Sequence, residues 1–419
     1  MLAASFMTAA VATPVAQAQN FKLLHQFAGT DGIAPQGTLV RDSAGNLYGT
    51  ASQGGSSNQV GCFTCGVVFK LDTAGTLTVL HYFTGGADGS FPMAGLTEDA
   101  KGNLYGTASY GGNDSDITCN YRGCGVVFKL NTAGTTFKTL YTFQGSPDGQ
   151  GPQGVLVRDA KGNLYGTTAY GGTIGVGTVF ELSPAGNETA EYSFTDGPAM
   201  YGGSPLSGVI RDSAGNLYGT TASGDGSGGV VYKLDTSGNE TPLFFFPLNP
   251  SEYGVDGAFP LAPLTRDAAG NLYGTTTVGG TGDAVGNCPV GCGVVFKVDT
   301  AGNTTVLHNF AGPEGNEPVG GVIQDAAGNL YGTTTNGGTG QFINGCGVVF
   351  KLTPAGKLKV LYNFTGGTDG AGPWAGLACD RANLDKPCPT SGYLYGSTTG
   401  ASVPYGGAGL YGTLFSIKY

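Results

Sequence analysis

A five-residue string repeats along the chain and limits the folds that are open to it. Asn-Leu-Tyr-Gly-Thr begins at Asn46, Asn103, Asn163, Asn216, Asn271 and Asn329, and a weaker copy, Tyr-Leu-Tyr-Gly-Ser, begins at Tyr393. The central tyrosines of these copies are about 58 residues apart on average. Seven copies at this period are typical of the blades of a β-propeller with long loops.

Each repeat contains four short runs of β-branched and aromatic residues, which predict four strands. Residues 154–159, 163–168, 125–130 and 305–310 are examples of the first, second, third and fourth run. Asp-x-x-Gly-Asn joins the first run to the second, and a similar turn joins the third to the fourth, as in a tight hairpin. Long glycine-rich loops join the second run to the third. With 78 glycines in 419 residues, the chain is also a poor helix former.

The predicted fold is an all-β, seven-bladed propeller of four-stranded antiparallel blades within residues 19–419. The last repeat ends after its third strand, and a matching fourth strand stands near the other end of the chain, in residues 21–27. We therefore expect the N-terminal strand to complete the C-terminal blade, which hides the edges of an open sheet. An open solenoid is the alternative. The expected blades are residues 28–83, 84–143, 144–194, 195–246, 247–310, 311–364, and 365–419 together with 20–27.

The repeat resembles the GloVer tandem repeat of bacterial "choice-of-anchor" surface and secreted proteins. The resemblance rests on Gly-Asn-Leu-Tyr-Gly-Thr, on Gly-Val-Val-Phe-Lys-Leu and on Asp-Gly-x-x-Pro, and it covers residues 20–419. More loosely, the units are similar to NHL-type propeller blades. The resemblance implies an exported propeller and no established catalytic activity. Members of the family carry different C-terminal anchoring signals, whereas this chain ends at its last predicted strand, so we expect secretion rather than anchoring.

The first 18 residues have the features of a signal peptide. Residues 1–18 are uncharged and apolar, and they end in Ala16-Gln17-Ala18, a small-x-small cleavage pattern. The basic segment that opens such peptides is missing, so we expect the true start codon upstream. No later run reaches the roughly 18 apolar residues that span a bilayer. We expect an exported monomer, secreted, periplasmic or at the cell surface. The net charge of −10 argues against a nucleic-acid partner.

Eight of the nine cysteines form near pairs in the sequence: Cys62/Cys65, Cys119/Cys124, Cys288/Cys292 and Cys379/Cys388. In an exported protein, such pairs predict local disulfides that close the glycine-rich loops. Redox or zinc chemistry at Cys62-x-x-Cys65 is the alternative. Cys346 has no near partner, which leaves a free thiol or an intermolecular bond.

Histidine occurs only at His25, His81 and His308, always in the same position of the predicted fourth strand. Other repeats place Tyr141 or Tyr362 there. A position that accepts both residues is expected to be a packing position on an outer strand, and a general base would have to converge with other groups. The chain also contains no nucleophile elbow, zinc-protease or phosphate-loop motif. We therefore predict no catalytic residue.

The linkers between repeats hold the candidate ligand-binding residues. Their acids are Asp31, Asp88, Asp148, Asp196, Asp256, Glu314 and Asp369. Propeller topology places the linkers on the face where the long loops emerge, so the acids are expected around the channel mouth. There they could bind a cation such as Ca²⁺ or set a negative potential. Alternatively, Asp-Gly is only a turn that is repeated with the blade.

Two further features complete the candidate site. Asp114-Ser-Asp116, in a loop of the second repeat, is a weaker calcium candidate, and no other cofactor is expected. Trp374, the only tryptophan, follows Pro373 in the last linker and suits contact with carbohydrate or protein.

Seven near-equivalent repeats without a unique catalytic cluster predict a non-catalytic binding or scaffold protein for an unknown extracellular protein or carbohydrate. One alternative is a metal-dependent hydrolase, similar to the lactonase propellers, in which carboxylates and an Asn converge on one ion in the channel. The other alternative is a structural matrix protein.

Overall fold

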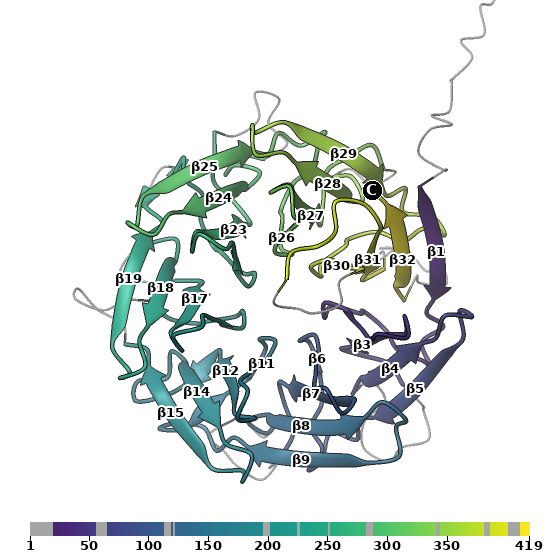
Figure 1. The fold of residues 1–419 in the computed structure, drawn as a ribbon, viewed down its shortest axis with the longest axis vertical. Helices are drawn as coiled ribbons and strands as arrows, with labels where there is room; N and C mark the ends of the chain where they lie inside the picture. Colours follow the sequence, from purple (N-terminus) through teal and green to yellow (C-terminus); the bar gives the residue numbers. More distant parts are fainter. Residues whose placement is uncertain are drawn as a thin grey trace, which may run out of the picture.

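The computed structural model describes residues 20–55, 65–112, 119, 122–195, 202–223, 227–249, 252–281, 288–340, 344–380, 386–400 and 411–419. These residues form seven four-stranded antiparallel sheets and no α-helix. The sheets are arranged as blades around a central axis (Figure 1). The seven-bladed propeller predicted from the sequence is confirmed. The predicted signal peptide lies outside the described residues.

The four strands of each blade follow one another from the channel to the rim. From the innermost to the outermost strand, blade 1 is β2 (Val40–Arg41), β3 (Leu47–Ala51), β4 (Val67–Leu71) and β5 (Leu77–Tyr82); blade 2 is β6 (Thr97–Glu98), β7 (Asn103–Ala108), β8 (Val126–Asn131) and β9 (Phe137–Thr142); blade 3 is β11 (Val157–Arg158), β12 (Leu164–Thr168), β14 (Thr178–Leu182) and β15 (Glu188–Ser193); blade 4 is β16 (Ile210–Arg211), β17 (Leu217–Thr221), β18 (Val230–Leu234) and β19 (Glu240–Phe245). Blade 5 is β22 (Thr265–Arg266), β23 (Leu272–Thr276), β24 (Val294–Val298) and β25 (Thr304–Asn309); blade 6 is β26 (Ile323–Gln324), β27 (Leu330–Thr334), β28 (Val348–Leu352) and β29 (Leu358–Asn363); blade 7 is β30 (Ala378–Cys379), β31 (Tyr393–Thr398), β32 (Thr413–Lys418) and β1 (Phe21–Gln26). Two short pairs, β10 (Gly149–Gln150) with β13 (Tyr170–Gly171) and β20 (Leu248–Asn249) with β21 (Glu252–Tyr253), lie outside the blades.

The ring closes as predicted, because β1 pairs with β32 at the rim of blade 7 (Figure 1). In the register of this antiparallel pair, Leu23 lies opposite Phe415 and His25 lies opposite Leu414. The Phe21 ring stacks on Tyr362 of blade 6, with ring centroids 4.1 Å apart. The N-terminal strand therefore completes blade 7 and also packs against blade 6.

The glycine of the Leu-Tyr-Gly-Thr strand makes room for an aromatic ring on the third strand. A Cβ atom added to Gly332 would lie 2.6 Å from Cζ of Phe350, which is closer than real Cβ contacts. The same arrangement places Gly49 against Phe69 in blade 1. These rings are fully buried and fill the space between sheets. The repeated glycine is thus a packing requirement of the blade.

Edge-on aromatic pairs join every blade to the next. The phenylalanine that follows each outer strand packs against the third-strand ring of the following blade, with centroids 5.1–5.3 Å apart. The pairs are Phe27–Phe69, Phe83–Phe128, Phe143–Phe180, Phe194–Tyr232, Phe246–Phe296, Phe310–Phe350 and Phe364–Phe415. Because Phe27 follows β1, the series runs unbroken through the closing blade.

A second set of contacts joins the blades near the channel. The threonine hydroxyl of each Leu-Tyr-Gly-Thr strand donates a hydrogen bond to a carbonyl oxygen in the linker that enters the next blade, at 2.7–3.5 Å. The pairs are Thr50–Ala94, Thr107–Gly154, Thr167–Ser207, Thr220–Ala262, Thr275–Gly320 and Thr333–Ala375. In blade 7 the hydroxyl of Ser397 donates to the Pro35 carbonyl at 2.8 Å, so this series also closes.

The residue before each linker proline has an unusual backbone conformation. Ala34, Phe91, Ser204, Phe259 and Glu317 have φ between 53° and 58°, the left-handed region that non-glycine residues rarely adopt. Two neighbouring segments hold this conformation. The Ala34 amide donates to the Tyr411 carbonyl at 2.9 Å, and the Ala34 carbonyl accepts from the Ser52 amide at 3.1 Å. The repeated strain therefore belongs to the fold rather than to one site.

Three of the predicted disulfides are confirmed: Cys119–Cys124, Cys288–Cys292 and Cys379–Cys388. Cys65 is also disulfide-bonded, while Cys62 lies outside the described residues. Cys346 is a buried free thiol in the core between blades 6 and 7. Cys119–Cys124 and Cys288–Cys292 lie in long loops between second and third strands, whereas Cys379–Cys388 lies between β30 and β31. Disulfides are typical of proteins in oxidising compartments.

Candidate functional site

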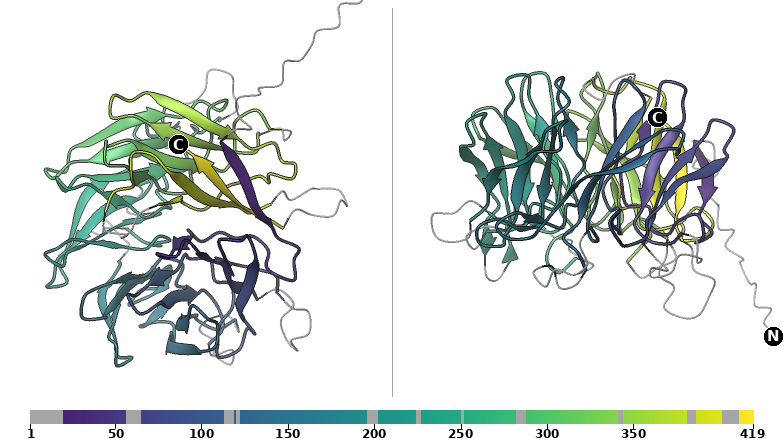
Figure 2. Two further views of the ribbon diagram at one scale, coloured as in Figure 1. Left: turned by 45° about the vertical axis from the view of Figure 1, so that its right-hand side comes forward. Right: turned by 90° about the horizontal axis from the view of Figure 1, so that it is seen from below.

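The linkers and the long loops share one face of the disc, as predicted. In each blade the linker pairs with the loop that follows the second strand, for example Ser90 with Tyr110 and Ala258 with Val278. We call this side the linker face. The opposite side, the turn face, is formed by the short connections between the first and second strands and between the third and fourth. Figure 2 shows the disc edge-on, with the strands running between the two faces.

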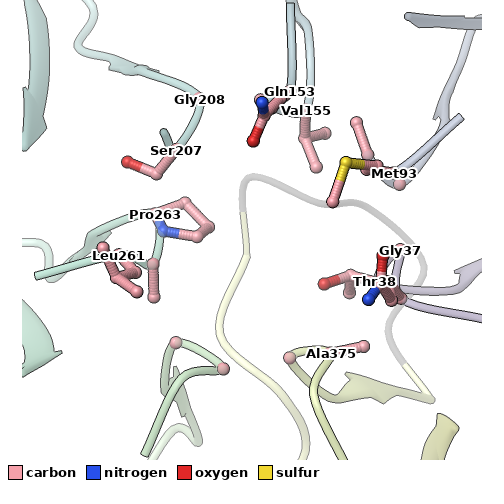
Figure 3. Close-up of a pocket in the computed structure, with 18 of the residues that line it drawn as sticks. Gly37, Thr38, Met93, Gln153, Val155, Ser207, Gly208, Leu261, Pro263 and Ala375 are labelled. Atoms are coloured by element: carbon pink, nitrogen blue, oxygen red, sulfur yellow. The ribbon is translucent and has the colours of Figure 1, made fainter. Parts of the chain in front are cut away.

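The channel is lined by seven equivalent three-residue segments, each directly after a linker proline. The segments are 36–38, 93–95, 153–155, 206–208, 261–263, 319–321 and 374–376, and they enclose about 150 Å³. Figure 3 shows Met93, Val155, Gln153 and Pro263 around this space, each from a different blade apart from the neighbours Gln153 and Val155. The middle residue of each segment is Gly, Ala or Ser, which lets the chain pass close to the adjacent blade.

The first residue of these segments varies around the ring: Gln36, Met93, Gln153, Leu206, Leu261, Val319 and Trp374. None of the channel-lining residues in the described part of the chain carries a charge. Trp374 is 39% exposed, the largest side chain of the set. The described channel lining therefore presents apolar groups, side-chain amides, the hydroxyls of Thr38 and Ser207, and one indole.

The structure places most of the described linker acids beside the outer strands. None of the described linker acids lines the channel; most bond to the end of the preceding outer strand. His25 pairs with Asp31 at 2.8 Å and His81 with Asp88 at 3.0 Å, while His308 pairs with Glu314 at 2.7 Å. The Tyr141 hydroxyl donates to Asp148 at 3.0 Å and the Tyr362 hydroxyl donates to Asp369 at 2.9 Å. The physical reason is the His or Tyr side chain on the preceding outer strand, which offers each of these five carboxylates a hydrogen bond.

The backbone fixes these carboxylates as well. The Ala28 amide donates to Asp31, and the Thr84 amide donates to Asp88 at 3.0 Å. Burial by itself would raise the pKa of both acids, but hydrogen bonds from the histidine and from these backbone amides outweigh it, so each pKa falls below its usual value. Both carboxylates therefore stay ionised at neutral pH.

Two linker acids differ from this pattern. Asp196 lies outside the described residues, as do Asp114 and Asp116. Asp256 follows an outer strand that has Phe244 in the position of the histidines, and a phenyl ring cannot hydrogen-bond a carboxylate. Within the described part of the chain, no three His, Cys, Asp or Glu side chains lie close enough to share a metal ion. The described channel-lining residues include no carboxylate, which is the ligand type that the lactonase-like alternative places in the channel.

Sequence reasoning missed the role of the histidines and of the channel segments. His25, His81 and His308 are on outer strands, as predicted, but they anchor the linker acids rather than only fill space. A constant spacing of six or seven residues between this position and the acid could have indicated the pairing. The variable residue after each linker proline could likewise have indicated the channel lining.

The turn face carries a repeated polar network. Asp42 accepts hydrogen bonds from the Asn46 amide and the Tyr48 hydroxyl, and equivalent trios recur in the following blades. Arg266 lies over the Tyr218 ring of the preceding blade, with its Cζ 5.7 Å from the ring centroid. Because these groups recur with the repeat, they stabilise turns and blade seams and define no single site.

These features define the class: a closed, seven-bladed β-propeller with a neutral channel and a loop-bearing linker face. The chain belongs to the family of the Gloeobacter/Verrucomicrobia repeat, whose model matches residues 11–119, 116–287 and 283–419. This confirms the resemblance drawn from the sequence. No curated protein matches the chain. No helix in the described residues is long and apolar enough to cross a membrane.

Solved structures match the chain at low sequence identity. The extracellular domain of a one-component system from B. thetaiotaomicron matches 96% of this chain at 10% identity and a TM-score of 0.56, and the match spans 40% of that protein. A gluconolactonase from Xanthomonas campestris matches 78% of this chain and 91% of its own at 15% identity and a TM-score of 0.41. At these identities the likeness concerns the fold alone.

Proposed function

We propose that this protein is an exported, non-catalytic binding protein whose ligand contacts the linker face around the channel. Disulfides at the loop bases and the uncharged residues 1–18 support export. The main support for ligand binding is that the residue after the linker proline differs from blade to blade around the channel.

Positions that only maintain a repeat fold are the same in every repeat. The glycine beside the third-strand ring and the linker proline recur in all seven blades. The residue after that proline occupies seven equivalent positions at the channel and yet ranges from Val319 to Gln153 and Trp374. Packing needs therefore do not dictate it. A ring of different side chains on a constant scaffold is how a repeat protein makes one asymmetric contact surface.

The titratable side chains support binding rather than catalysis. All described linker acids except Asp256 bond to the outer strand that precedes them, and they lie at separate blades. Each of the three histidines is paired with one of these acids. General acid–base chemistry needs such groups to converge on one bound molecule. The described channel lining instead offers side chains for van der Waals contact and neutral hydrogen bonds.

The test is a binding screen against glycan and peptide arrays with the mature protein and with a triple variant. Met93→Ala, Gln153→Ala and Trp374→Ala together remove three varied side chains without touching the seams between blades. The matched control is Tyr393→Ala, which removes an exposed ring from the turn face. We expect binding that the triple variant loses and the control retains. Absence of any bound class, or equal binding by all three proteins, would contradict the proposal and favour a structural matrix role.

A further inference from the structure

Exposed apolar side chains gather on the linker face. Among the described residues, the large exposed apolar side chains other than Leu23 and Tyr393 lie in linkers, in long loops or at the linker-face ends of outer strands: Tyr82, Tyr170, Ile174, Phe245, Val255, Val290, Trp374 and Tyr411. Val255 is 63% exposed and Ile174 is 52% exposed. These side chains belong to several blades, and their uncovered apolar area lies mainly on the linker face, where a partner that spans several blades could cover it.

Positive charge is nearly absent from the same face. Of the 19 Lys and Arg residues, only Arg122 belongs to a linker or a long loop among the described residues; the others there stand in strands or in turn-face connections. The Arg122 guanidinium lies over the Tyr110 ring, 5.9 Å from its centroid. The described acids of the linker face are Asp31, Asp88, Asp148, Asp256, Glu314, Glu317 and Asp369. Among the described residues, the linker face therefore carries seven carboxylates and a single guanidinium.

From these two observations we infer that the partner of the linker face is a cationic polypeptide that also presents apolar side chains. This inference rests on the proposed function and names the partner class. Electrostatic complementarity to the acids would orient the partner and speed its arrival. The aliphatic groups of Val255, Ile174 and Val290 need apolar side chains to cover them, which a polypeptide provides. A neutral sugar would not explain the exclusion of Lys and Arg from this face.

Three synthetic peptides of equal length and without tryptophan separate the contribution of positive charge to binding from that of apolar side chains. The first combines Lys and Arg with Phe and Ile in a Gly/Ser spacer; the second replaces its basic residues with Glu; the third replaces its apolar residues with Ser. Trp374 is the only tryptophan of the chain and lies at the centre of the linker face, so its fluorescence reports binding on this face. Calorimetry gives the affinity at low and at physiological salt.

We expect the first peptide to bind and to change the Trp374 emission, with an affinity at least tenfold higher than that of either other peptide and weaker at higher salt. Val255→Ser combined with Ile174→Ser should weaken this binding about tenfold. Tyr393→Ser, on the turn face, should leave it unchanged. All three residues are exposed, so the variants keep the fold.

Equal affinity for the cationic and acidic peptides, no binding of the first peptide, or equal effects of the variants on both faces would overturn the inference. If the arrays nevertheless identify a neutral glycan whose binding depends on Trp374, the proposed function stands and the cationic partner is wrong. If no array class binds, the proposed function itself fails.

Discussion

A half-buried carboxyl group at the seam between blades 3 and 4 should destabilise the protein at alkaline pH. Glu240 begins β19 and accepts a hydrogen bond from the Tyr192 hydroxyl through Oε2, at 3.3 Å. Its Oε1 is buried and has no hydrogen-bond partner among the described residues. Burial raises the pKa of Glu240 from 4.5 to about 7, although the Tyr192 hydrogen bond acts in the opposite direction.

The sign of the pH dependence follows from the raised pKa. Between pH 4.5 and 7 the Glu240 carboxyl of the folded protein holds a proton that the unfolded chain has lost. The contribution of Glu240 to stability is therefore highest below about pH 4.5 and is lost as the pH rises through 7. The interval from 4.5 to about 7 corresponds to about 3 kcal/mol for a fully desolvated group. Solvent access to the half-buried Glu240 side chain reduces this to about 1–2 kcal/mol.

Glu240→Gln should remove this cost while it keeps an acceptor for the Tyr192 hydroxyl. We expect the Tm to rise by about 2 °C at pH 8 and to change little at pH 4.5. Thermal unfolding followed by circular dichroism at both pH values measures the difference. Glu188, whose pKa is also raised to about 7 by burial and by the nearby Asp148 and Glu191 carboxylates, offers an independent repeat as Glu188→Gln.

Glu181→Gln serves as the matched control, because it removes the same charge from the adjacent strand β14 of blade 3. A stabilisation of Glu240→Gln that is the same at pH 4.5 and pH 8, or no stabilisation at pH 8, would refute the assignment of a buried charge at this seam.

Three further predictions concern closure and packing. Phe21→Ala should lower the free energy of unfolding by about 2–3 kcal/mol in a urea titration, because it removes the ring stacked on Tyr362. An unchanged urea midpoint would contradict the conclusion that β1 stabilises the contact between blades 6 and 7. Gly332→Ala should cost about 1–3 kcal/mol in the same assay, because the added Cβ would overlap the Phe350 ring, and a neutral result would refute that packing argument. Ala34→Gly should raise the Tm in calorimetry and increase the free energy of unfolding by about 0.5–1 kcal/mol, because glycine adopts the φ of 54° without strain. A loss of stability would show that the greater conformational entropy of glycine in the unfolded chain outweighs the relief of strain.

The fold could be predicted because its signals are local and repeated. Asp-x-x-Gly-Asn specifies the hairpin between the first two strands, and the structure shows why: Asp42 accepts hydrogen bonds from the Asn46 backbone amide and side-chain amide. The last repeat lacks its fourth strand, and a matching strand stands before the first repeat. This arrangement predicted that the ring closes through the N-terminal strand. The cysteine pairs followed from their short separations.

The site could be predicted only in part, because a turn motif does not say where its carboxylate points. Asp-Gly in the linker is compatible with a side chain that faces the channel or with one that faces its own outer strand. The choice depends on His81 or Tyr141, seven residues away across the turn. The channel lining was missed for the opposite reason: Met93 and Gln153 carry no motif, and only their equivalent places in seven repeats reveal them.

The threonine-to-carbonyl bonds near the channel have a consequence for how such a ring can originate. Each bond runs in the same rotational sense, from one blade to the linker of its successor, so every unit of about 58 residues carries one donor and one acceptor of its own. Gene duplication or loss of a whole unit would leave all of these local bonds satisfiable. The number seven must then be selected by the wedge angle of the blades and by how well the terminal strand meets its neighbour.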